Sequence, residues 1–202
     1  MYKKYFKRLF DLILSLFLII LFLPVMFLIF FLVWYFIGFP IFKHKRPGLN
    51  NKIFSVYKFK TLYDSKKKNL YKKSKLGNFL RKSGLDELPQ LFNVLGNTMS
   101  IVGPRPLLVK YLKIKSFRNN KRKNCLPGIT GLFQVETFNK SIKKKRNSKW
   151  KDQFTLDKKY VENVSFVLDL IIIFKKLLKI INPSSYKIDY YNEKTLYDKY
   201  IK

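Results

Sequence analysis

The sequence predicts an α+β protein that is mainly helical, with an N-terminal membrane segment followed by a small globular domain. Three observations predict this class: a long apolar run at residues 12–37, a short strand pattern at residues 53–59, and an apolar helical pattern at residues 165–181. A chain of 202 residues has room for one domain and an anchor, but not for two full-sized domains.

The composition is strongly basic and also rich in apolar residues. Lys and Arg number 42 against 12 Asp and Glu, a net charge of +30 that predicts an anionic partner such as nucleic acid, a phospholipid surface or a phosphorylated substrate. Hydrophobic residues make up 48%, which excludes a disordered polybasic tail. One cysteine, Cys125, and one histidine, His44, exclude a disulfide framework, a Cys-cluster metal site and a multi-His zinc site. Carboxylates, hydroxyls, Lys and Arg must therefore supply any chemistry.

The apolar run from Leu12 to Ile37 is interrupted by Ser15 and Pro24 alone. A straight helix of this length would reach roughly 39 Å, more than the ~30 Å of a bilayer's hydrocarbon core. The run is too long for a cleaved signal peptide, and no small-residue cleavage site follows it. The run is therefore predicted to be a membrane segment.

Basic residues flank both ends of this segment. They are Lys3, Lys4, Lys7 and Arg8 before it, and Lys43, His44, Lys45 and Arg46 after it. A spanning helix usually has its Lys and Arg excess on one side, so symmetric flanks favour a segment that enters and leaves through the same face. Pro24 would supply the bend, because proline removes one backbone hydrogen bond. Spanning helices also tolerate proline, so a plain spanning anchor and a re-entrant hairpin both remain open.

The rest of the chain alternates turn signals with short elements. Turns are predicted at Pro47-Gly48 and Asn50-Asn51, a strand at 53–59, a mobile lysine-rich loop at 66–75, and helices at about 76–82 and 86–95. Asp169 and three lysines make the helix at 165–181 too polar to span. It could lie on a membrane surface with its lysines at lipid phosphates, or it could be a core helix. No structure is assigned after Pro183.

Asp86 and Glu87 are the only acidic residues between positions 65 and 135, a stretch rich in Lys and Arg. Such surroundings keep a carboxylate ionised, and an ionised Asp can attack phosphorus or hold Mg²⁺ together with phosphate oxygens. Arg81 lies five residues earlier, and Arg105 lies between two prolines on a stiff loop, where its guanidinium could grip a phosphate with two hydrogen bonds. An isolated Asp-Glu pair can also simply cap a helix, so the pair alone leaves both interpretations open.

Asp86 and Glu87 belong to a series of longer motifs that follow one another in a fixed order. Because of these motifs, the chain resembles the bacterial sugar transferase family, whose members are small monotopic polyprenyl-phosphate phosphoglycosyl transferases. The resemblance covers roughly residues 2–181. The motifs are KRLFD at 7–11, RPG at 46–48, YKFKT at 57–61, LDELPQLFNVL at 85–95, MSIVGPRP at 99–106, PGITG at 127–131, QV at 134–135, and YVEN at 160–163 with Ser165 and Asp169-Leu170.

The resemblance implies an enzyme that moves a sugar phosphate from a nucleotide diphosphate sugar, usually a UDP-sugar, to polyprenyl (undecaprenyl) phosphate. This is the first membrane step of capsule, lipopolysaccharide O-antigen or protein glycan assembly. By its position in the family motif, Asp86 would be the nucleophile that forms a covalent phosphosugar intermediate, and Glu87 would assist the acceptor phosphate. Mg²⁺ would sit between Asp86 and the donor diphosphate. The substrate-binding residues would be Lys60, Arg81, Arg105, Thr130 and Gln134.

The resemblance also implies an architecture and a location. Residues 1–38 would form a re-entrant helix-break-helix hairpin in the membrane, residues 39–181 a cytoplasmic catalytic domain with interfacial amphipathic helices, and residues 182–202 a C-terminal tail. The protein would lie at the cytoplasmic face of the bacterial inner membrane. Its partners would be the nucleotide sugar, polyprenyl phosphate and anionic lipids, with no nucleic acid.

Five departures from the family pattern bear on activity. Leu23 replaces a Ser, Thr98 an acid, Leu126 an Arg, Leu132 a Trp, and Glu136-Thr137-Phe138 an Asn-Gly-Arg. The lost Arg at Phe138 removes a plausible phosphate contact, which a cation from the group Lys140, Lys143, Lys144, Lys145 and Arg146 could replace. The sequence favours an active enzyme. An inactive or scaffolding membrane protein of the same fold remains an alternative, and so does a basic nucleic-acid-binding protein, although the apolar run argues against the latter.

Overall fold

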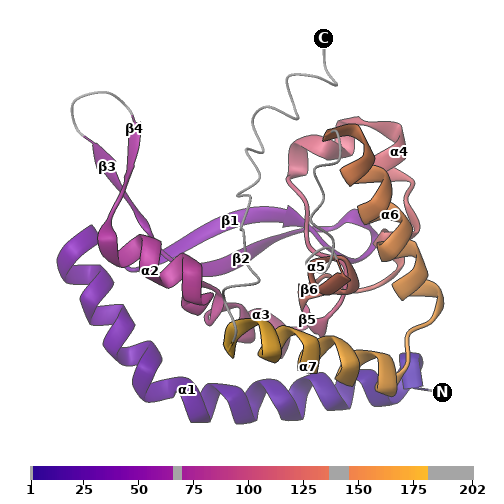
Figure 1. Ribbon diagram of the computed structural model, residues 1–202, viewed down its shortest axis with the longest axis horizontal. Helices are drawn as coiled ribbons and strands as arrows, with labels where there is room; N and C mark the ends of the chain where they lie inside the picture. The colour runs from indigo at the N-terminus through magenta and orange to yellow at the C-terminus, as the bar shows by residue number, and fades with distance from the viewer. Residues whose placement is uncertain (1, 66–69, 137–145, 182–202) are drawn as a thin grey trace. The chain divides into compact units, whose positions relative to one another are not determined.

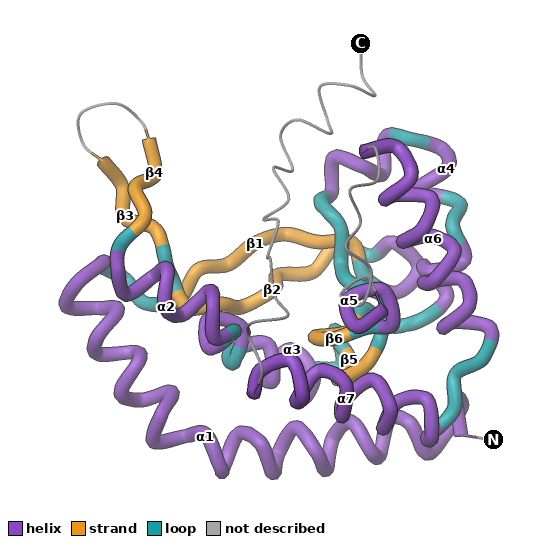
Figure 2. The backbone as a smooth tube through the Cα atoms, in the orientation of Figure 1, coloured by secondary structure: helices purple, strands orange, loops and turns teal. Residues whose placement is uncertain are grey.

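The computed structural model describes residues 2–65, 70–136 and 146–181. These residues are mainly helical and include three two-stranded sheets, as Figures 1 and 2 show. The sheets pair β1 (Ile41–Pro47) with β2 (Ile53–Phe59), β3 (Leu62–Ser65) with β4 (Leu70–Lys73), and β5 (Ser100–Val102) with β6 (Gly128–Thr130). The α-helices are α1 (Lys7–Ile37), α2 (Lys75–Ser83), α3 (Gln90–Leu95), α4 (Lys115–Arg118), α5 (Leu132–Glu136), α6 (Arg146–Glu162) and α7 (Phe166–Ile181).

Short helical turns link these elements. They are the π-helix η1 (Tyr2–Phe6) and the 3₁₀ helices η2 (Leu49–Asn51), η3 (Leu85–Glu87), η4 (Val109–Lys113) and η5 (Lys121–Asn124). The chain divides into two compact units: the first comprises residues 1–45 and 54–101, and the second residues 46–53 and 102–202. The first unit therefore carries α1 together with the Asp86-Glu87 pair.

The apolar run forms one uninterrupted helix, α1, which contains Pro24. Figure 1 shows that this helix is bent. The sequence led us to expect two helices separated by a break, but the structure has one continuous helix with a bend. A proline removes one backbone hydrogen bond and crowds the preceding turn, and the other hydrogen bonds of the helix can still form. By length and composition α1 can cross a membrane.

The C-terminal half of α1 packs into the core of the first unit. Ile29, Val33 and Ile37 lie four residues apart, so they share one face of the helix, and all three are buried. They form a hydrophobic cluster with Phe59 of β2 and Leu80 of α2. This end of α1 is therefore part of the globular unit.

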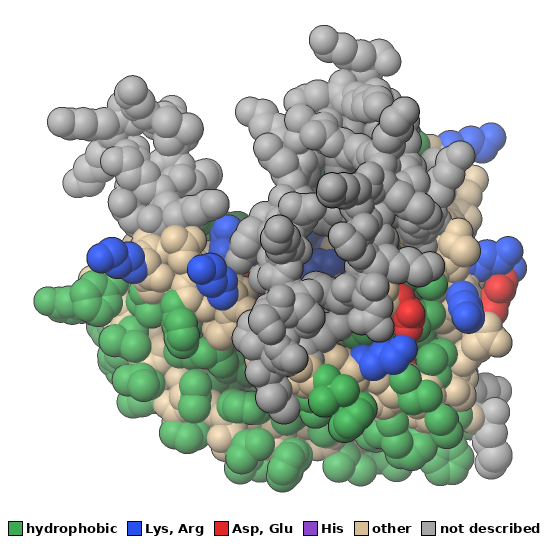
Figure 3. Space-filling view, viewed as in Figure 1, with side chains coloured by type: hydrophobic (Ala, Val, Ile, Leu, Met, Phe, Trp, Pro, Cys, Tyr) green, Lys and Arg blue, Asp and Glu red, His purple; other side chains and the backbone are tan. Residues whose placement is uncertain are grey.

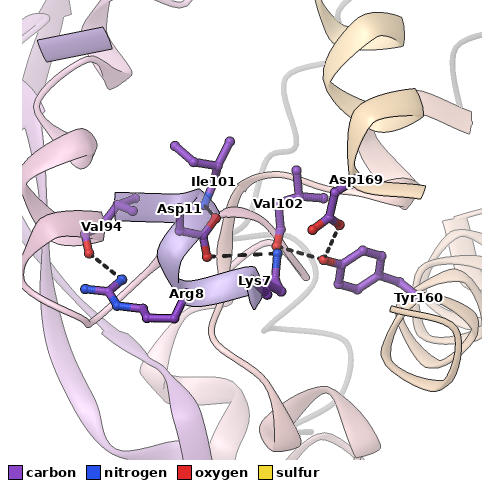
Figure 4. Close-up of polar contacts among 8 residues, drawn as sticks. All are labelled: Lys7, Arg8, Asp11, Val94, Ile101, Val102, Tyr160 and Asp169. Carbon is purple, nitrogen blue, oxygen red and sulfur yellow. Dashed lines mark hydrogen bonds and ion pairs between the residues drawn. The ribbon is translucent and has the colours of Figure 1, made fainter. Parts of the chain in front are cut away.

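The N-terminal end of α1 is tied to the same unit by polar contacts, shown in Figure 4. The Arg8 guanidinium donates to the carbonyl oxygens of Val94 at 2.7 Å and Leu95 at 3.1 Å, which satisfies carbonyls at the end of α3. The buried Asp11 carboxylate accepts from the backbone N–H of Ile101 at 3.0 Å. Both ends of α1 thus contact residues of the first unit.

The remaining face of α1 exposes large apolar side chains, which gather over the helix in Figure 3. A soluble protein rarely exposes so large a contiguous apolar surface to water. Together with the length of the helix, this surface indicates a membrane-associated protein. The exposed residues include Leu9, Ile13, Leu16, Phe17, Ile20, Leu21, Phe27, Leu28, Trp34 and Phe36.

Several predicted elements are confirmed and two are corrected. The strand at 53–59 is β2, the helix at 76–82 is α2 and the helix at 165–181 is α7. The expected loop at 66–75 is wrong for Leu70–Lys73, which forms β4 and pairs antiparallel with β3 in the register Leu62↔Lys73. The expected helix at 86–95 is divided into η3 and α3, which begins after Pro89. The predicted tail at 182–202 lies outside the described residues.

In the second unit, α7 buries a narrow stripe and leaves a wide apolar face exposed. Asp169 and Ile172 are fully buried, while the exposed face consists of Phe166, Val167, Leu170, Ile171, Phe174, Leu177 and Leu178. The Tyr160 hydroxyl of α6 lies 2.8 Å from Asp169 Oδ1 and 2.9 Å from the Val102 carbonyl oxygen (Figure 4). Asp169 therefore holds α7 to α6 and to the chain leaving β5.

Candidate active site

Asp86 and Glu87 lie on the short helix η3, directly after α2. The helix α2 begins at its N-cap Ser74, whose hydroxyl accepts from the Gly77 N–H at 2.7 Å, and ends at Gly84 with φ +77°. A left-handed residue at this point favours glycine, because a side chain would be strained there. The turn at Gly84 thus places the two carboxylates in succession at the end of α2, with Asp86 buried at 9% exposure.

Glu87 is held by a lysine that the sequence analysis did not select. Lys58 Nζ of β2 donates to Glu87 Oε1 at 2.6 Å, and the two side chains are 24% and 19% exposed. This ion pair places a positive charge next to the two adjacent carboxylates. The pair therefore links β2 to the two acids.

Lys58 belongs to the motif YKFKT at 57–61, two residues before Lys60, the lysine that the family motif suggested. Lys60 follows the last residue of β2, and its backbone N–H donates to the Pro40 carbonyl oxygen at 2.8 Å. Membership of the same motif could have identified Lys58 as a second candidate cation.

Arg81 is oriented by a contact that crosses from α2 to the end of β2. Its Nε donates to Thr61 Oγ1 at 2.7 Å, and Thr61 is buried. The helix approaches this residue closely, since a Cβ added to Gly77 would lie 1.9 Å from the Thr61 carbonyl oxygen. Gly77 thus permits the approach that brings Arg81 to Thr61.

The donor set suits a magnesium ion shared with substrate, not one caged by protein. Among the residues that the structure describes, no three His, Cys, Asp or Glu side chains gather into a metal-binding group. Mg²⁺ is commonly held by one or two carboxylates together with substrate phosphates and water. Asp86 fits that role, while Lys58 occupies one oxygen of Glu87.

In the second unit, the loop that carries Arg105 is held at four consecutive residues. The Val102 carbonyl oxygen lies 2.9 Å from the Tyr160 hydroxyl, and the Gly103 N–H donates to the Thr130 carbonyl oxygen at 2.9 Å. The Pro104 carbonyl oxygen accepts from the Gly128 N–H at 3.1 Å. The Arg105 carbonyl oxygen accepts from Arg122 Nη2. The side chain of Arg105 itself is exposed.

Close backbone packing reinforces this loop. A Cβ added to Gly128 would lie 2.0 Å from the Gly103 nitrogen, and a Cβ added to Gly131 would lie 2.3 Å from the Gly103 carbonyl oxygen. The structure brings Thr130, buried at 5% exposure, to this loop, and Gln134 follows on α5. The Thr130 hydroxyl oxygen is buried and has no hydrogen-bond partner among the described residues.

The departures from the family pattern have local explanations at two positions. Thr98 Oγ1 donates to the Asn93 carbonyl oxygen at 3.0 Å and accepts from Asn93 Nδ2 at 3.2 Å, so it stabilises the turn after α3. Glu136 accepts from Lys175 of α7 at 2.6 Å, which neutralises its charge. Phe138 and the lysines at 140 and 143–145 lie outside the described residues.

Comparisons with known proteins agree with the motifs. The family model for bacterial sugar transferase matches residues 2–183. The chain is 40% identical over 182 residues to the uncharacterized sugar transferase EpsL of Bacillus subtilis, covering 87% of each protein. It is 35% identical over 156 residues to the UDP-glucose:undecaprenyl-phosphate glucose-1-phosphate transferase of Xanthomonas campestris, covering 71% of this chain and 32% of that protein.

A third relative is the undecaprenyl-phosphate galactose phosphotransferase of Salmonella typhimurium, 32% identical over 195 residues. That alignment covers 85% of this chain and 40% of the relative, so the chain spans well under half the length of both relatives whose names state a substrate. The assignment to a family rests on the family model, which matches nearly all of the sequence, and on the alignment with EpsL, which covers 87% of that protein. The chain belongs to the bacterial sugar transferase family.

Proposed function

We propose that this chain is a membrane-bound glycosyl-1-phosphate transferase that moves a sugar phosphate from a UDP-sugar to undecaprenyl phosphate. The observation that carries the proposal is the adjacent carboxylates at the end of α2, with Asp86 buried and Glu87 paired with Lys58, in a chain of the sugar transferase family. The substrates follow from two relatives whose names specify undecaprenyl phosphate, one of them with UDP-glucose as donor.

The chemistry assigned to this chain is a double displacement. The ionised Asp86 attacks the phosphorus that bears the sugar, a phosphoanhydride bond breaks, and uridine monophosphate leaves. An oxygen of undecaprenyl phosphate then attacks the same phosphorus, which forms the lipid diphosphate sugar and restores the Asp86 carboxylate. Glu87, held by Lys58, orients the acceptor phosphate and takes its proton. Lys58, Lys60 and Arg81 supply the positive charge that attracts both anionic substrates.

Asp86 would hold Mg²⁺ together with the donor diphosphate. When bound, the ion would neutralise charge on the diphosphate oxygens and so stabilise the leaving group. Arg105, on the second unit, is the further cation that the family motif suggests for a donor phosphate; its backbone carbonyl is held by Arg122 and the residue is exposed.

A re-entrant arrangement of α1 completes the proposal. A straight helix of 31 residues would measure ~46 Å, and its ends would emerge on opposite sides of a bilayer. Both ends of α1 instead contact the first unit, through Arg8 and Asp11 at one end and Val33 and Ile37 at the other. Together with the bend and the basic flanks, these contacts support a helix that dips into the cytoplasmic leaflet of the inner membrane and returns.

The test measures nucleotide release from purified, full-length protein in detergent. With undecaprenyl phosphate, Mg²⁺ and a panel of nucleotide sugars, we expect one UDP-sugar to release uridine monophosphate. Asp86→Asn should abolish release and capture no phosphosugar adduct, because an amide is not an anionic nucleophile. Glu87→Gln should slow turnover severely while still allowing the adduct to form.

The matched control is Glu162→Gln, a carboxylate of the second unit that forms an exposed ion pair with Lys121 at 2.7 Å. It should retain wild-type turnover. Wild-type activity in Asp86→Asn would place the nucleophile elsewhere. Absence of release from every nucleotide sugar by the wild-type protein would favour a non-catalytic membrane protein of this fold.

A further inference from the structure

A buried ion pair outside the carboxylate site holds the loop that carries Arg105. Arg122, on η5, donates from Nη2 to the Arg105 carbonyl oxygen, and its Nη1 lies 3.6 Å from Asp157 Oδ2 of α6. The Arg122 and Asp157 side chains are 10% and 3% exposed. A charged pair is rarely buried without a structural or functional reason, because desolvation offsets much of its attraction.

Arg122 is too enclosed to bind a substrate phosphate directly. Its side chain is 10% exposed, and the pocket beside it is lined by Pro104, Pro106 and Cys125, among others. Any influence of Arg122 on an anionic substrate must therefore pass through the groups that it touches.

We propose that Arg122, fixed by Asp157, is a positioning residue for Arg105 in donor binding. The inference rests on the proposed function, in which Arg105 contacts the donor diphosphate. The planar guanidinium makes two contacts in different directions: Nη2 donates a hydrogen bond to the Arg105 carbonyl oxygen, and Nη1 forms an ion pair with the Asp157 carboxylate. A lysine at the same position keeps the charge but not this fork. The pair therefore fixes the backbone from which the exposed Arg105 side chain extends.

The other anchors of the loop explain why one added contact matters. Val102, Gly103 and Pro104 are held from the side of α6 and β6, and the next contact along the chain is that between Arg105 and Arg122. Without Arg122, the loop keeps its contacts at Val102, Gly103 and Pro104 but loses the hydrogen bond to the Arg105 carbonyl oxygen. A guanidinium displaced by about 1 Å loses bidentate contact with a phosphate, an error that can cost on the order of a hundredfold in rate.

The first experiment measures how easily the backbone of the loop opens, and it requires no catalytic turnover. Hydrogen exchange of the full-length protein in detergent is compared for wild type, Arg122→Lys and Asp157→Asn, following the peptides over residues 102–108 and 126–131. Both variants should exchange faster in these peptides, because the Gly128 N–H is bonded to the Pro104 carbonyl oxygen. Peptides of α1 and α3 should be unchanged, which separates a local release from general unfolding.

The second experiment is a double-mutant cycle on donor KM. Arg122→Lys alone should raise donor KM about tenfold to a hundredfold with a smaller change in kcat. On an Arg105→Ala background the same change should alter donor KM by about twofold at most, because the group it positions is gone. Asp157→Glu, which restores a carboxylate, should recover part of the KM that Asp157→Asn loses.

The matched control is the neighbouring ion pair between the same two elements, Lys121 on η5 and Glu162 on α6. Lys121→Gln should leave both exchange and donor KM at wild-type values. Unchanged exchange in Arg122→Lys and Asp157→Asn would overturn the inference, whatever the activity. Equal effects of Arg122→Lys with and without Arg105 would overturn it as well. If wild type releases no nucleotide, the proposed function fails, and the exchange comparison still decides whether Arg122 holds the loop.

Discussion

Asp157 illustrates how burial and an ion pair act on one carboxyl group in opposite directions. Burial raises the pKa of Asp157 from its ordinary 3.8 to about 6, although the Arg122 guanidinium and a hydrogen bond from Gln153 both act to lower it. Burial also lowers the pKa of Arg122, but an arginine remains protonated at neutral pH. The Asp157 carboxyl group is therefore half ionised near pH 6, and the ion pair is predominantly formed only above that pH.

This shift predicts a pH-dependent difference in stability. Between about pH 4 and 6, Asp157 keeps a proton in the folded protein and loses it in the unfolded chain. The free energy of unfolding contributed by Asp157 must therefore fall as pH rises across this window, on the order of 1 kcal/mol per pH unit. Asp157→Asn lacks this proton, so the stability of wild type relative to the variant should decline from pH 4 to 6 and level off above it.

Denaturant unfolding of both proteins in the same detergent, at half-unit pH steps, measures this difference. Parallel pH dependences for wild type and variant would show that Asp157 has an ordinary pKa in the folded protein. Glu162 provides an internal comparison, because its hydrogen bond with Lys121 lowers its pKa, a shift opposite in direction to that of Asp157.

At individual residues, the sequence can suggest candidate side chains but not their partners. Asp86 and Glu87 could be selected because they are the only acids in a long basic stretch. Lys58 could be found from its place in the motif YKFKT, but its pairing with Glu87 depends on where η3 lies against β2. The Arg122–Asp157 pair joins positions 35 residues apart, and nothing local in the sequence indicates that contact.

Among the secondary-structure elements, α2 determines where Arg81 and the two acids lie. Its close approach to Thr61 depends on the absence of a side chain at Gly77, since an added Cβ would lie 1.9 Å from the Thr61 carbonyl oxygen. Backbone cannot yield as a flexible side chain does, so a larger residue must displace the helix. The contact between Arg81 and Thr61 would then lengthen.

Gly77→Ala is therefore expected to destabilise the protein by about 1–3 kcal/mol, which corresponds to a fall in Tm of roughly 3–10 °C for a chain of this size. The matched control is Gly96→Ala, where the nearest atom, the Phe92 carbonyl oxygen, lies 3.3 Å from an added Cβ. That change should stay within about 0.5 kcal/mol of wild type. Thermal melts of both variants in detergent provide the measurement, and equal Tm values for the two would contradict the packing argument.

Elements with strong local patterns could be predicted, and those that depend on distant pairing could not. The β-branched and aromatic residues of β2 and the apolar helical pattern of α7 are local signals, and both predictions hold. The strand β4 lies in a lysine-rich stretch without a strand pattern, and it forms because Leu70–Lys73 pairs with β3. The helix α6 (Arg146–Glu162) carries charged residues around most of its surface, so it has no clear apolar stripe to reveal it.

On the scale of the whole molecule, charge and apolar surface support the same proposal. A net charge of +30 would attract anionic lipids and the phosphorylated substrates proposed above, while the exposed apolar face of α1 favours a hydrocarbon environment. The sequence could predict both properties because neither depends on the fold. The path of α1 is different, because basic flanks and a proline also fit a spanning helix, and it is the contacts at the two ends of α1 that support the re-entrant path proposed above.

The re-entrant path predicts that residues 3 and 45 lie on the same, cytoplasmic side of the membrane. Cysteine would be introduced at either position, or at Val25 within α1, after Cys125→Ser removes the native thiol. In intact bacterial cells a membrane-impermeant maleimide should label none of the three. After permeabilisation it should label Lys3→Cys and Lys45→Cys but not Val25→Cys, because a thiol in hydrocarbon does not ionise and react. Labelling of one end in intact cells would mean that α1 crosses the membrane. The contacts that bring both of its ends to the first unit could then not coexist with insertion, since about 30 Å of hydrocarbon would separate them.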